Sequence, residues 1–144
     1  MNAIYQSNRL GILGTIAASV ISLATYSSIA FADQVKLSGD QEVPPVKTSA
    51  SGSGTIMVNP DMTVSGSVNT TGVAGTAAHI HSGAMGKNGP VAVPLTKSGD
   101  AGWSVPAGAK LTADQYKAYK AGELYVNVHS AANKGGEIRG QLKP

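Results

Sequence analysis

Short strand-like runs, separated by turn-forming residues, recur from residue 33 to residue 144 and constrain the fold more than any other feature of the sequence. The runs are rich in Val, Thr, Ile and Tyr, and Gly, Pro, Asn and Asp lie between them. The expected strands are residues 35–38, 55–58, 62–68, 77–82, 90–95, 103–105, 123–129 and 137–142. The sequence therefore predicts an all-β protein, an antiparallel Greek-key β-sandwich or barrel of about seven or eight strands with one short helix.

The segments between these runs carry their own signals. Residues 59–61, Asn-Pro-Asp, predict the turn of a hairpin, and the Ser- and Gly-rich residues 48–54 predict a surface loop. One stretch favours a helix, residues 111–121, with Thr112 as its N-cap and Gly122 as its stop.

The first 32 residues have the layout of a secretory signal peptide. Arg9 ends a short polar segment, residues 10–29 are apolar and uncharged, and residues 30–32, Ala-Phe-Ala, offer a cleavage pattern. The apolar run is long enough for an uncleaved membrane anchor, but the cleavage pattern favours removal. We expect a signal peptide at 1–32 and a single domain at 33–144. We also expect export to the periplasm or the extracellular space, without stable membrane insertion after cleavage.

The composition limits what can hold this domain together and what it can bind. The chain has no cysteine, so a hydrophobic core must stabilise it without disulfides. Arg9 is the sole charge of the expected signal peptide, so 10 of the 11 Lys and Arg remain, against 8 Asp and Glu, a net charge of +2. This charge is too mild to argue for nucleic acid, and we expect no such partner. The oligomeric state stays open.

The three histidines are the strongest candidates for a functional site. His79 and His81 lie two residues apart in an expected strand, so their side chains point to one face. Ala78 and Ile80 then point to the opposite face, into a core. His129 ends another strand-like run.

A short internal similarity suggests that the third histidine joins the other two. His81-Ser82 and His129-Ser130 are each followed by a glycine-containing loop and a returning strand. If these two corners meet in space, all three imidazoles converge.

The order of several motifs resembles that of the CHRD domain, named for the animal protein chordin and also found in bacterial exported proteins. The resemblance covers essentially all of residues 33–144. Its motifs are Leu37-Ser38-Gly39, Glu42-Val43-Pro44-Pro45, Ala78-His79-Ile80-His81, Asn88-Gly89-Pro90-Val91, Tyr125-Val126-Asn127-Val128-His129 and Gly136-Glu137-Ile138-Arg139-Gly140.

The resemblance implies a β-sandwich-like domain. Some bacterial members look like copper-dependent superoxide dismutases, whereas chordin is a regulator that binds growth factors. His79, His81 and His129 match the histidines of the family, and the pattern also matches at Arg139. Met85 lies outside the family motif.

A set of three imidazoles with no neighbouring thiol or carboxylate favours an open metal site. Imidazole suits copper and zinc, affinity among divalent ions peaks at copper, and a closed structural zinc site normally has four protein ligands. A three-histidine zinc hydrolase has the same ligand count, but no carboxylate is an evident general base. The alternative is that the histidines simply bond to loop backbones. Met85 is either a packing residue or a soft axial ligand.

Arg139 is the candidate catalytic residue. Its guanidinium would overhang the open copper position and attract superoxide, a small anion. The alternative is a solvated strand residue or a salt bridge with Glu137.

Together these patterns favour an exported copper-only superoxide dismutase. Copper–zinc dismutases also combine a His-x-His pair with a late arginine, but they have more histidines and a disulfide, so we expect no zinc partner site. The main alternative is a non-catalytic module for copper storage, copper delivery or protein recognition. A zinc hydrolase ranks behind both.

Overall fold

The structure is a computed structural model and describes residues 31–144. The expected signal peptide lies outside the described residues, except for Phe31 and Ala32, which begin the first strand. The elements are β1 (Phe31–Ser38), a 3₁₀ helix η1 (Gly39–Gln41), β2 (Ser51–Val58), β3 (Val64–Thr71), β4 (Gly75–Ser82), β5 (Val91–Pro94), β6 (Thr96–Ser98), β7 (Gly102–Ser104), α1 (Ala113–Lys120), β8 (Leu124–Ser130) and β9 (Ile138–Gln141).

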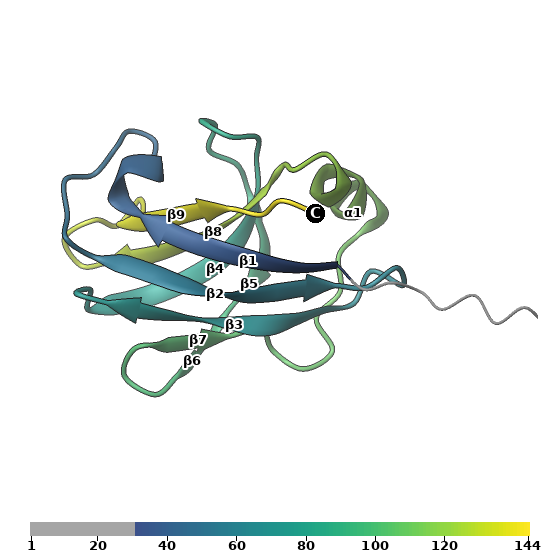
Figure 1. Ribbon diagram of the computed structural model, residues 1–144, viewed down its shortest axis with the longest axis horizontal. Coiled ribbons are helices and arrows are strands. Elements are labelled where there is room, and N and C mark those ends of the chain that lie inside the picture. The colour runs from purple at the N-terminus through teal and green to yellow at the C-terminus, as the bar shows by residue number, and fades with distance from the viewer. Residues whose placement is uncertain (1–30) are drawn as a thin grey trace, which may run out of the picture.

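All nine strands belong to one antiparallel sheet that curves almost into a barrel (Figure 1). The strand order is β5-β4-β8-β9-β1-β2-β3-β7-β6, and Leu95 alone separates the two end strands, β5 and β6, in the chain. Leu95 N donates to Ala78 O at 2.9 Å, and Lys97 Nζ donates to Gly75 O at 3.2 Å, so both ends of the sheet meet at β4. The predicted all-β antiparallel fold with one short helix is confirmed.

One face of every long strand points into the barrel and forms the core. Ala78 and Ile80 of β4 are each 1% exposed, which confirms that they face inward while their histidine neighbours face outward. Burial of these apolar side chains is the main stabilising contribution to the fold. The core residues with almost no exposure also include Val35, Leu37, Ile56, Val58, Val68, Tyr119, Leu124, Val126, Val128, Ile138 and Leu142.

Two segments differ from the prediction. Residues 51–54, expected in a loop, pair with both β1 and β3 as the first half of β2. Gly54 lies there because a Cβ would collide with the carbonyl oxygen of Ser67, so this glycine marks close strand packing and not a turn. The strand β6 was missed because its three residues are all exposed and show no apolar alternation.

The predicted helix and turn both form. α1 begins after Thr112, whose Oγ1 accepts from Gln115 N at 3.2 Å, while Gln115 Oε1 accepts from Thr112 N at 2.8 Å. This capping box satisfies two backbone donors at the start of the helix. The turn at residues 59–61 continues through Met62, which has a φ of 71°.

We expect Thr112→Ala to lower the free energy of unfolding by about 1 kcal/mol, because it removes the cap acceptor. Urea denaturation of the variant and of Ser49→Ala, a substitution on an exposed loop, measures the effect. Equal stability of Thr112→Ala and the unaltered protein would contradict this role.

Candidate metal centre

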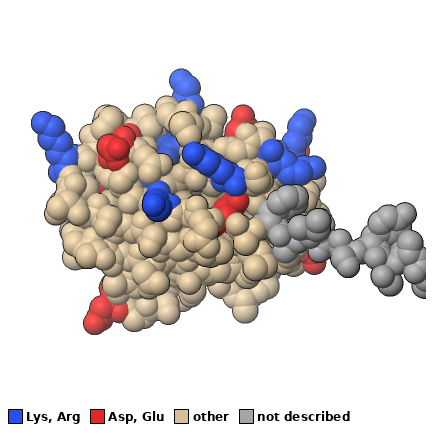
Figure 2. Space-filling view, viewed as in Figure 1, with Lys and Arg blue, Asp and Glu red and all other residues tan. Residues whose placement is uncertain are grey.

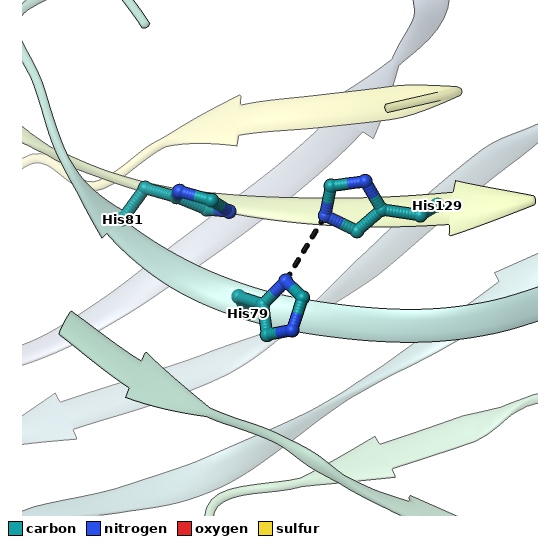
Figure 3. Close-up of side chains that lie close together, drawn as sticks. All are labelled: His79, His81 and His129. Atoms are coloured by element: carbon teal, nitrogen blue, oxygen red, sulfur yellow. Dashed lines mark hydrogen bonds between the residues drawn. The ribbon is translucent and has the colours of Figure 1, made fainter. Parts of the chain in front are cut away.

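Three histidine side chains from two neighbouring strands meet on the outer face of the sheet (Figure 3). β4 pairs with β8 so that His79 lies opposite Asn127 and Ala77 opposite His129, which puts all three imidazoles on one surface. His79 Nδ1 lies 3.0 Å from His129 Nε2, and one nitrogen from each ring lies within 4.8 Å of the others. The predicted convergence of the two histidine corners is therefore confirmed.

Backbone carbonyl groups fix the orientation of two of the rings. His81 Nδ1 donates to Gly89 O at 2.9 Å, and His129 Nδ1 donates to Lys134 O at 3.0 Å. Because a carbonyl oxygen can only accept, each Nδ1 carries the hydrogen and each Nε2 keeps a lone pair. Bonds of this kind orient histidines that bind metals.

Together, the three imidazole rings form a set that fits a metal ion. His81 Nε2 is buried and has no hydrogen-bond partner among the described residues, a costly state for a polar atom. Two nitrogens that each lie about 2.0–2.1 Å from one ion are themselves about 3 Å apart when they are adjacent ligands. The separation between His79 and His129 matches this value, and a nitrogen of His81 lies within 4.8 Å of both, so these residues could hold a metal.

The surroundings of His79 and His81 favour the neutral form of each ring. Burial lowers the pKa of His79, and the neighbouring His129 and His81 lower it further. Burial also lowers the pKa of His81, against the bond to Gly89 O, which raises it. A neutral ring keeps the lone pair that a metal requires.

Arg139, the candidate catalytic residue, lies beneath the surface, and its catalytic role stays a prediction. It is 1% exposed, and its Cζ lies 3.4 Å from the centre of the Tyr125 ring. This burial does not favour the expected arrangement, in which the guanidinium overhangs an open metal position and meets anions from solvent. The alternative, a salt bridge with Glu137, does not form either, since Glu137 Oε1 accepts from Thr48 Oγ1 at 2.8 Å.

Met85 is a loop residue that is 68% exposed. It lines a cavity of about 250 Å³ together with Glu42, Arg139 and Gln141. Its role as an axial ligand stays a prediction.

A layer of buried polar residues surrounds the site, and sequence reasoning missed most of it. Tyr125, Asn127 and Gln141 lie on the outer face of β8 and β9, yet they are at most 9% exposed. The sequence did indicate that Tyr125 and Asn127 share a face with His129, because these three residues alternate with core residues in β8.

Glu42 approaches this layer from the loop after η1. Its Oε1 accepts from Asn127 Nδ2 at 2.7 Å. Burial raises the pKa of Glu42 to about 7, although Arg139 and the bond from Asn127 oppose the shift. Gly136, with a φ of 138°, is required beside this pair because a Cβ would crowd both Glu42 and Asn127.

On the face shown in Figure 2, the Lys and Arg side chains are scattered among uncharged residues and do not form one patch. Within residues 31–144, no helix is long and apolar enough to cross a membrane.

The fold and the site define a small antiparallel β domain that carries a three-histidine group on its outer face. The family model of the CHRD domain matches residues 34–142, so the chain belongs to the CHRD family. No curated protein and no solved structure matches the chain.

Glu42 makes stability depend on pH. Its pKa in the folded protein, about 7, is above the 4.5 expected for an exposed glutamate, so folding favours the protonated form. The protonated carboxyl group contributes fully to the stability of the fold below pH 4.5. This contribution, up to about 3 kcal/mol, is lost as the pH rises through 7. Glu42→Gln, which mimics the protonated acid, should remove this loss.

Urea denaturation between pH 4.5 and 8 tests this expectation, with Glu123→Gln as the exposed control. The stability of Glu42→Gln relative to the unaltered protein should rise with pH. Parallel pH profiles for the two proteins would contradict it.

Proposed function

We propose that this CHRD domain is an exported copper-binding protein and acts as a copper-dependent superoxide dismutase. The observation that carries the proposal is the buried, unpartnered Nε2 of His81, which lies in a cluster with His79 and His129. An ion bound by all three rings would satisfy this atom. Export follows from the expected signal peptide and is part of the same proposal.

Copper suits the ligand set better than zinc does. The group consists of three histidines alone within residues 31–144, and the chain contains no cysteine. Three nitrogen ligands leave one side open, whereas structural zinc normally takes four protein ligands. A copper ion would supply one-electron chemistry, passing between Cu(II) and Cu(I) as one superoxide is oxidised and the next is reduced.

The protein residues have separate roles in this proposal. His79, His81 and His129 are only partly buried, so a small anion could approach from solvent. The carbonyl groups of Gly89 and Lys134 hold two of the rings with Nε2 toward the ion. Arg139 contributes positive potential from beneath the surface and does not receive the anion directly.

The burial of Arg139 favours a second candidate, a non-catalytic domain for copper storage, copper delivery or protein recognition. Arg139 does not expose its guanidinium to solvent, and this cation was the feature that most clearly suggested anion capture. A zinc hydrolase ranks behind both candidates, because the histidine group includes no carboxylate to serve as a general base.

We expect the protein to bind one copper ion per chain, and His79→Ala or His129→Ala to weaken binding at least about 100-fold, because each removes a ligand. Competition with a chelator of known affinity measures the effect, and Thr71→Ala, on an exposed strand position, is the control. Unchanged affinity in both histidine variants would contradict the proposed site.

Copper-loaded protein should remove superoxide catalytically, and the rate should collapse in His79→Ala and in His129→Ala. Stopped-flow measurement of superoxide decay distinguishes the candidates. Tight copper binding without turnover would indicate storage or delivery, and no metal uptake would indicate protein recognition. Full activity in the double variant would rule out the dismutase.

A further inference from the structure

The ring of Tyr125 lies between a metal-ligand candidate and a buried cation. The His81 and Tyr125 rings are parallel within 6°, with centres 5.0 Å apart. The Arg139 guanidinium lies over the same tyrosine ring, at 3.4 Å. Because β8 lies between β4 and β9 in the sheet, His81 and Arg139 approach Tyr125 from opposite sides.

One loop, residues 83–89, binds all three layers of this stack. Gly89 O accepts from His81 Nδ1 at 2.9 Å, and Gly89 N donates to Tyr125 Oη at 3.1 Å. A side chain at Gly89 would collide with the carbonyl oxygen of Ser82, so only glycine fits this position. The peptide of Gly89 therefore fixes the histidine and the tyrosine relative to each other.

The same loop holds the guanidinium. Arg139 Nη2 donates to Ala84 O and to Gln141 Oε1, both at 3.2 Å, and Nη1 donates to Asn88 Oδ1 at 3.4 Å. Asn88 Nδ2 in turn donates to Val43 O at 2.8 Å, which ties this loop to the loop after η1. These contacts allow the guanidinium little freedom to move away from the ring.

The positive charge of Arg139 is not neutralised by these contacts. All three hydrogen-bond acceptors are amide or carbonyl oxygens, and buried arginines are normally paired with a carboxylate. The nearby carboxyl group of Glu42 takes its hydrogen bond from Asn127, and it offsets part of the Arg139 charge only when it is ionised, because burial raises its pKa to about 7. A cation that is 1% exposed is poorly screened by solvent, so its field extends to the histidine cluster.

We propose that Arg139 and Tyr125 are positioning residues that act through His81, holding its ring in place and favouring Cu(I) over Cu(II) at the three-histidine site. This inference rests on the proposed copper function and adds the origin of the redox balance. A positive charge disfavours the more highly charged ion. A unit charge about 10 Å away, at an effective dielectric constant of about 20, changes an equilibrium constant roughly tenfold.

The test measures the affinities of Cu(I) and Cu(II) separately, by competition with a chelator specific for each ion. Arg139→Gln should lower the ratio of Cu(I) to Cu(II) affinity roughly tenfold, and Arg139→Lys should restore most of it. Lys87→Gln, which removes an exposed charge from the same loop, should leave the ratio within about twofold because solvent screens it.

A second pair of variants tests the stack when Arg139→Gln does not fold. Tyr125→Phe keeps the ring and should keep the ratio, whereas Tyr125→Leu removes the layer that orders both neighbours and should lower it. An unchanged ratio in folded Arg139→Gln, or in Tyr125→Leu, would overturn the inference. Absence of copper binding in the unaltered protein would instead refute the proposed function itself.

Discussion

The antiparallel pairing of β4 with β8 is the interaction on which the site depends. In the observed register, His79 and His81 face outward beside Tyr125, Asn127 and His129, while Ala78, Ile80, Val126 and Val128 face the core. A slip of one residue would turn His79 and His81 into the core and expose Ala78 and Ile80. Core burial therefore fixes the histidine geometry, because the fold loses its hydrophobic contacts if the register changes.

The sheet is covered on both faces around this point. Inside lies the apolar core of the barrel, and outside lies a smaller polar layer beneath the loops at residues 39–46 and 83–89. In that layer Arg139, Tyr125 and Asn127 are as buried as core residues. Polar groups inside a protein are stabilising when their bonds are made and costly when one is left open. Nε2 of His81, which has no hydrogen-bond partner among the described residues, therefore favours a bound ion at this layer.

The alternation of residues was sufficient to predict the strands that carry the histidines and the convergence of the three rings. The alternation could not predict the burial of Arg139, because this residue is covered by two loops that are distant from it in sequence. The strand pattern around Arg139 looks the same whether a loop covers it or solvent does. Gly54 was misread for a related reason, since glycine is typical of both turns and close strand contacts, and only the packing partner distinguishes them.

The central claim is that three imidazoles bind one ion, and the most direct measurement is the electron paramagnetic resonance spectrum of the Cu(II)-loaded protein. Nitrogen hyperfine structure should report three nitrogen ligands, and His129→Ala should reduce this number to two. A spectrum with one or two nitrogens in the unaltered protein, unchanged in His129→Ala, would contradict the account. His129 would then not be a copper ligand.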